Sequence, residues 1–195
     1  MRHGRFVNPA VRYTERMASQ RTIEGTVVAL CTAPSAGAPM LRHRQIELLA
    51  GKGIAGDRYA LGTGHWSDPR WPDQELTLIM AETAEALGLA PASLRRNIVT
   101  RGVDLDTLIG ATFRIGEATL LGVRRCDPCR WLEQFTRPGA MRELATRGGL
   151  RAHIVTGGSV QVGDHVVLAE ISERFWVDAM LGSFTDAGSD SIARL

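Results

Sequence analysis

The chain has 195 residues, of which 44% are hydrophobic and 23% are charged. This length and balance fit one well-buried domain with tails and exclude a disordered or fibrous chain. The formal net charge of +2 gives little support for nucleic-acid binding, and no apolar run approaches the roughly 20 residues that span a bilayer. The basic start of the chain lacks the apolar core of a secretory signal. We therefore expect a cytoplasmic protein with no nucleic-acid or membrane partner.

Arginine dominates the basic residues, because Lys52 is the only lysine among 23 lysines and arginines. High genomic GC content could produce this bias without functional meaning. Arginine nevertheless suits bidentate contacts with phosphate and carboxylate. Because the net charge is small, we expect any anion recognition to be local.

The pattern of the chain predicts one main domain, residues 22–170, after a loosely held arm at 1–21. β-Branched runs and glycine turns indicate many short strands. In chain order they lie at 22–30, at the start of 44–59, at 74–79, at 96–103, in two pieces of 111–126 around a turn at 115–117, and in a hairpin-like pair around Gly157 and Gly158 within 150–170.

Helical spacing and helix-ending residues indicate fewer helices, at 80–89, 131–135 and 140–146. The tail 171–195 contains an amphipathic stretch that either packs on the domain or forms a homodimer. Strands and helices do not alternate along the chain. The predicted fold is therefore α+β, mainly β, built on a β-barrel with a few peripheral helices.

The sharpest motif is Cys126-Asp127-Pro128-Cys129, which lies among Arg124, Arg125 and Arg130. A zinc site would need two more ligands at suitable spacing, and a thioredoxin-like pair would need a βαβ setting. Two readings stay open: a structural pair of free cysteines, or a reactive or metal-binding thiolate favoured by nearby cations and a helix start. Cys31, within an apolar strand, is read as a small buried hydrophobe.

Two further segments are ambiguous when each is viewed alone. Residues 51–59, GKGIAGDRY, match neither a P-loop nor a dinucleotide fingerprint, and their simplest role is a turn in which Asp57 caps backbone amides. Residues 94–102, LRRNIVTRG, are either a solvated loop before a strand or an anion-binding segment. The stretch 66–76 carries two tryptophans and is either a site lid or a packed surface loop.

Taken in order, three blocks of sequence resemble the MOSC family, named for the C-terminal domain of molybdenum-cofactor sulfurases. They are GIAGDRY, then RRNIVTRGVDLDTLIGATFRIGEATLLGVRRCDPCRWLE, then GGLRAHIVTGGSVQVGDHVVL, and the likeness spans roughly residues 23–170. The resemblance is to a stand-alone member of bacterial type, because the N-terminal β-barrel of the amidoxime-reducing relatives has no counterpart. It implies a MOSC-type β-barrel, similar to the barrel of pyruvate kinase.

The resemblance also implies a site. In molybdenum-binding relatives, a cysteine at the position of Cys129 supplies a thiolate to the metal, and Asn97 matches the asparagine of a cofactor-contacting segment. Arg95 or Arg96 falls where relatives place basic residues near the pterin phosphate. Further candidates for catalysis or for cofactor contact are Cys126, Asp57, Arg58, Arg124, Arg125 and Arg151. A soft thiolate suits molybdenum, and arginines suit a phosphate.

Two functions follow as expectations. The first is a molybdenum-cofactor enzyme that reduces N-hydroxylated or N-oxide small molecules with electrons from a separate reductase. The second is a sulfur carrier that accepts persulfide sulfur from a cysteine desulfurase for cofactor or metal–sulfur cluster assembly. Pyridoxal phosphate would then belong to that partner, because nothing independent supports a Schiff base on Lys52.

Overall fold

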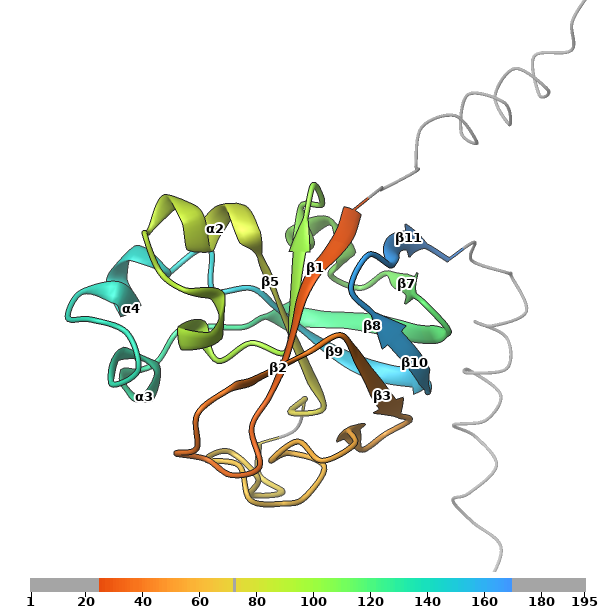
Figure 1. Ribbon diagram of the computed structural model, residues 1–195, viewed down its shortest axis with the longest axis horizontal. Coiled ribbons are helices and arrows are strands. Elements are labelled where there is room, and N and C mark those ends of the chain that lie inside the picture. The colour runs from red at the N-terminus through yellow and green to blue at the C-terminus, as the bar shows by residue number, and fades with distance from the viewer. Residues whose placement is uncertain (1–24, 72, 170–195) are drawn as a thin grey trace, which may run out of the picture.

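The computed structural model describes residues 25–71 and 73–169 (Figure 1). The predicted arm 1–21 and the predicted C-terminal helix and tail 171–195 lie outside these residues. Within them, strands dominate and the helices are short, as the predicted fold class requires. None of these helices has the length and apolarity of a membrane-spanning helix.

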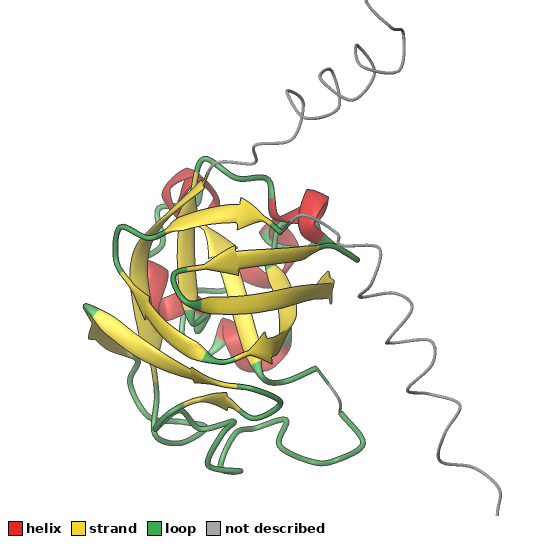
Figure 2. Cartoon of the chain, turned by 90° about the vertical axis from the view of Figure 1, so that its right-hand side faces the viewer, coloured by secondary structure: helices red, strands yellow, loops and turns green. Residues whose placement is uncertain are grey.

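A closed seven-stranded barrel is the centre of the fold (Figure 2). The strands follow the order β11-β7-β8-β9-β5-β6-β1, and β1 pairs again with β11, which closes the sheet. Only β5 and β6 are parallel among these pairs. The barrel strands are β1 (Gly25–Thr32), β5 (Leu76–Met80), β6 (Ile98–Arg101), β7 (Thr112–Ile115), β8 (Ala118–Arg125), β9 (Leu150–Thr156) and β11 (His165–Leu168).

Alternating burial along β8 and β9 shows why these segments form barrel strands. Every second side chain points into the barrel, where Phe113, Leu120, Ile154 and Val166 pack in one apolar cluster. A small three-stranded sheet of β10 (Gly158–Gln161), β3 (Gln45–Leu49) and β4 (Gly53–Ile54) extends this core, and β2 (Leu41–His43) pairs with β1 outside the barrel.

A second apolar cluster joins the outside of the barrel to the helices. Ile79 and Val99 face Leu132 of α3 (Arg130–Glu133), and Leu144 follows α4 (Ala140–Glu143). Helix α2 (Ala81–Ala86) and the short 3₁₀ helix η1 (Pro91–Leu94) also belong to this layer. A second 3₁₀ helix, η2 (Leu105–Leu108), packs near β8. The helices gather on one side of the barrel (Figure 1). This side therefore holds the loop that carries Cys126 and Cys129.

The predicted hairpin around Gly157 and Gly158 is wrong. β9 pairs with β8 and β5, whereas β10 crosses over to pair with β3. The glycines permit this departure, because a Cβ on Gly157 would lie 2.4 Å from the Leu48 carbonyl oxygen. The turn at 115–117 is confirmed as the link between β7 and β8. The short strands β2 and β4 were not predicted, and each has only two or three residues.

Candidate functional site

A cavity of about 260 Å³ opens between the Cys126–Cys129 loop, the segment 95–96 and the long loop from β4 to β5. This last loop runs from orange to yellow in Figure 1. Most of the predicted site residues line the cavity: Arg58, Arg95, Arg96, Arg124, Cys126, Cys129 and Arg151. The three motifs of the sequence therefore meet at one place. Asp57, Asn97 and Arg125 are the predicted residues that are not among its lining.

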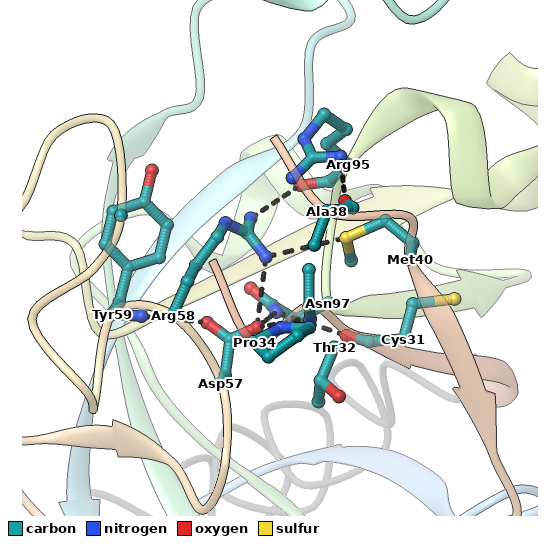
Figure 3. A network of polar contacts seen from close by, with 12 residues as sticks. Cys31, Thr32, Pro34, Ala38, Met40, Asp57, Arg58, Tyr59, Arg95 and Asn97 are labelled. Atoms are coloured by element: carbon teal, nitrogen blue, oxygen red, sulfur yellow. Dashed lines mark hydrogen bonds and ion pairs between the residues drawn. The ribbon is translucent and has the colours of Figure 1, made fainter. Parts of the chain in front are cut away.

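Asp57 is a buried hub of polar contacts (Figure 3), and it does not line the cavity. Its carboxylate accepts backbone N–H groups from Ala33 at 3.0 Å and Tyr59 at 3.2 Å. This confirms the predicted turn in which Asp57 caps backbone amides. The same carboxylate pairs with the Arg58 guanidinium at 3.0 Å.

Asn97 joins this hub to the barrel. Its side-chain oxygen accepts the Thr77 hydroxyl at 2.8 Å, and its amide nitrogen donates to the Cys31 carbonyl at 3.2 Å and to Asp57 at 3.4 Å. The side chain is completely buried. The structure thus gives Asn97 a positioning role, and its direct contact with a cofactor stays a prediction.

Arg58 and Arg95 tie three segments together at the cavity floor (Figure 3). Arg58 donates to the Arg95 carbonyl at 3.2 Å, and Arg95 donates to the carbonyls of Ala36 and Ala38 at 2.7 and 2.9 Å. Arg95 has a left-handed backbone, with φ of 54°. Burial, and secondarily the charge of Arg58, lowers the pKa of Arg95. Much of the donor capacity of these arginines is therefore already used within the protein.

Arg96 holds the cysteine loop from below. Its guanidinium donates to the carbonyls of Gly148 at 2.8 Å, Leu94 at 3.3 Å and Cys126 at 3.1 Å, and the residue is 7% exposed. All three guanidinium nitrogens of Arg96 therefore donate hydrogen bonds within the protein. The structure therefore supports a role for Arg96 in shaping the cavity, while its predicted contact with a phosphate stays a prediction.

We expect Arg96→Lys to lower the free energy of unfolding by about 2 kcal/mol, although the charge is kept. A single ammonium cannot span three diverging carbonyls, and each buried carbonyl that loses its partner costs about 1–3 kcal/mol. Urea unfolding followed by tryptophan fluorescence measures the change. Arg125→Lys is the matched control, because the exposed Arg125 forms a surface ion pair with Asp106 and does not line the cavity. Equal stability of both variants would contradict the role of Arg96.

The two cysteines of the motif differ in depth. Cys126 is 1% exposed and its backbone is held by Gly149 and Arg96, whereas Cys129 is partly exposed and directly precedes α3. All three cysteines are free thiols. The expected helix support for a thiolate is small, because α3 is a single turn. Cys31 is a buried core residue, as predicted, and burial raises the pKa of its thiol.

The remaining predicted arginines, Arg124, Arg125 and Arg151, differ in their interaction partners. Arg125 turns away from the cavity to pair with Asp106 at 2.7 Å, and this hydrogen bond raises the pKa of Arg125. Arg124 lines the cavity but pairs with Asp73 at 3.3 Å and Asp127 at 3.8 Å. Arg151 donates through Nη1 to the Asp73 carbonyl and to Gln74, while its buried Nε has no hydrogen-bond partner among the described residues. Arg151 therefore has unused donor capacity, and its predicted contact with an anion stays a prediction.

An aromatic wall completes the cavity. His65 stacks on Trp131 with ring centroids 4.4 Å apart, and Trp66 contacts Trp71 edge to face at 5.3 Å. Trp66, Trp71 and Gln74 of the tryptophan-containing stretch thus line the cavity. Tyr59, His65 and Trp131 had no predicted role at the site. For two of them the sequence held a usable clue, because Tyr59 directly follows Arg58 and Trp131 lies two residues after Cys129.

The side-chain donors that line the cavity are mainly guanidinium groups and two thiols. In residues 25–71 and 73–169, no three His, Cys, Asp or Glu side chains are grouped so that they could hold a metal ion. One partly exposed thiol and a cationic wall are chemically compatible with a metal that arrives within an anionic organic cofactor. Lys52 lies in the exposed turn between β3 and β4, and it does not line the cavity.

Comparison with known families identifies the domain. Residues 71–167 match the family model described as the MOSC domain, and this range contains the cysteine motif and the segment 95–97. The chain belongs to the MOSC domain family. No curated protein matches the chain. The match begins at Trp71, so the hub residues Asp57 and Arg58 precede it in the sequence.

Solved structures share the fold of this MOSC domain at low sequence identity. YuaD from Bacillus subtilis superposes with a TM-score of 0.63 and 17% identity, covering 78% of this chain and 99% of that one. YiiM from Geobacillus stearothermophilus gives 0.57 and 14% over 75% of each chain. YiiM from Escherichia coli gives 0.53 and 19%, covering 75% and 71%. These likenesses establish the barrel fold alone.

Proposed function

We propose that this MOSC domain binds molybdenum cofactor in the cavity, with Cys129 as the protein ligand to the metal. The observation that supports the proposal is that one cavity is lined by a partly exposed thiol, Cys129, and by Arg151, whose buried Nε has no partner among the described residues. A soft thiolate suits molybdenum, and a guanidinium suits the phosphate of the pterin. Arg151 would hold that phosphate, with Arg124 as a weaker, rim-exposed contributor.

The proposed reaction is reduction of N-hydroxylated or N-oxide small molecules. When bound, the cofactor supplies the two-electron redox chemistry, and a separate reductase protein supplies the electrons. The chain's own contribution is to orient and enclose the substrate between the aromatic wall and the arginines. Trp66, Trp71 and Trp131 offer apolar surface that excludes water, while Arg96 fixes the loop that carries Cys129 by donating to the Cys126 carbonyl.

Metal and pterin content of the purified protein tests this proposal. Expression in a host that makes the cofactor should give molybdenum and pterin in nearly equal amounts, approaching one of each per chain. Expression in a matched strain that cannot make the cofactor should give neither. Protein from the competent host that carries no molybdenum would refute cofactor binding.

The alternative function is a sulfur carrier for cofactor or metal–sulfur cluster assembly. The observation in its favour is that Cys126 and Cys129 line the same cavity, so that one thiol could accept sulfur from a desulfurase persulfide while the other resolves it. Pyridoxal phosphate would remain on the desulfurase. The metal measurement separates the two functions, because a carrier of this kind needs no resident molybdenum.

A further inference from the structure

Tyr59 is a cavity-lining residue that carries an exchangeable proton. It follows Arg58 in the turn after β4 and lines the cavity together with Cys126, Cys129 and Arg151. In Figure 3 its ring lies beside Arg58, and its hydroxyl points away from the Asp57 hub. A side-chain hydrogen bond with Arg58 links the phenol to the edge of the polar network that holds the cavity floor.

The ring of Tyr59 is held on both sides. The Arg58 guanidinium lies 4.8 Å from the ring centroid, and the backbone N–H of Tyr59 donates to Asp57 at 3.2 Å. On another side the ring packs against Gly64, where an added Cβ would lie 2.5 Å from Cε1 and 2.6 Å from Cδ1 of the tyrosine. Gly64 therefore makes room for the phenol in this position.

The charges around Tyr59 suit a group that gives up a proton and then takes it back. Burial raises the pKa of Tyr59 above its ordinary value, while the positive charges of Arg58 and Arg151 and the side-chain hydrogen bond with Arg58 partly oppose that rise, and a Cys126 thiolate would add to it. Arg95 also interacts with the phenolate. The phenol is thus protonated at neutral pH, and three guanidinium groups stabilise the phenolate once it forms.

The other proton-bearing side chains of the cavity are less suited. His65 is stacked flat on Trp131, with an interplanar angle of 4°. The Asp127 side chain is 72% exposed and interacts with Arg124 at 3.8 Å, so bulk water competes with any transfer from it. Tyr59 combines burial with a fixed ring and cationic neighbours.

We propose that the Tyr59 hydroxyl is the proton donor for reductive cleavage of the N–O bond, an inference that rests on the proposed function. The overall reaction is R–NH–OH + 2e⁻ + 2H⁺ → R–NH₂ + H₂O. The N–O bond breaks, and one new N–H and one new O–H bond form. The electrons come from the separate reductase. Tyr59 gives one proton and solvent the other, after which solvent reprotonates the phenolate.

Steady-state kinetics of the molybdenum-loaded protein with benzamidoxime and a reduced viologen dye test the proposal. We expect Tyr59→Phe to lower kcat about 100-fold, the scale of a lost general acid, and to change KM less than threefold. Tyr13→Phe is the matched control, since the chain has two tyrosines, and it should leave kcat unchanged. Gly64→Ala should lower kcat as Tyr59→Phe does, although it keeps the hydroxyl, because its Cβ displaces the ring.

A second readout needs neither cofactor nor activity. In the cofactor-free Tyr13→Phe protein, the tyrosinate absorbance titration reports Tyr59 alone, and we expect a midpoint above that of free tyrosine. A kcat of Tyr59→Phe within twofold of the wild type, or a midpoint below that of free tyrosine, would overturn the role of Tyr59 alone. A wild-type protein that holds molybdenum but does not reduce benzamidoxime would overturn both the proposed reaction and this role.

Discussion

Asp57→Ala should lower the free energy of unfolding by about 3–5 kcal/mol, the cost of breaking a buried ion pair from one side. The Asp57 carboxylate is fully buried and serves four donors at once, from Ala33, Arg58, Tyr59 and Asn97. Without it, the Arg58 guanidinium, only 4% exposed, keeps its charge and loses its carboxylate partner. The uncompensated charge, more than any lost packing, makes the effect large.

Urea unfolding of Asp57→Ala and of a milder variant, Asp57→Asn, measures this cost. The asparagine keeps one acceptor oxygen, so its loss of stability should be smaller but still clear. Asp68→Ala is the matched control, because the Asp68–Arg70 pair has similar geometry, with atoms 2.7 Å apart, but is solvent-exposed. It should unfold at the urea concentration of the wild type. If Asp57→Ala did so too, the hub would not be what stabilises this end of the barrel.

The strand pairings that sequence predicts well are those between strands that are also neighbours in sequence. β7 and β8 join through a glycine turn, and β8 shows the alternation of a half-buried strand. Barrel closure depends instead on pairing between β1 and β11, in which Gly25 lies opposite Val166, about 140 residues away in sequence. The same holds for β10, which leaves β9 for β3. A local pattern cannot distinguish such partners.

At the site, sequence brings the right residues together but does not assign their roles. The motifs place Arg95, Arg96 and Arg151 near one another through the family resemblance, and the cavity contains all three. Whether an arginine is free to bind an anion depends on which backbone carbonyls surround it. Arg96 donates to three of them, whereas the Nε of Arg151 has no partner among the described residues. That difference comes from tertiary structure.

Serine substitution at each of the three cysteines separates metal binding from folding. Cys129→Ser should reduce the molybdenum content of the purified protein at least tenfold, because a hydroxyl is a harder and far less acidic ligand than a thiol. Cys126→Ser should retain most of the metal, since Cys126 is 1% exposed and its backbone is anchored by Gly149 and Arg96. Molybdenum per chain, measured by elemental analysis alongside the urea midpoint, gives the comparison.

Cys31→Ser is the control for damage to the core. Cys31 lies in β1 with no exposed surface and does not line the cavity, so a hydroxyl there should cost about 1–3 kcal/mol of stability. The folded fraction should still bind molybdenum as the wild type does. Loss of metal from Cys126→Ser alone would transfer the ligand role to the deeper thiol. If both Cys126→Ser and Cys129→Ser retained molybdenum, neither cysteine would be a ligand of the cofactor. The difference in exposure between the two cysteines would then matter for folding and not for metal binding.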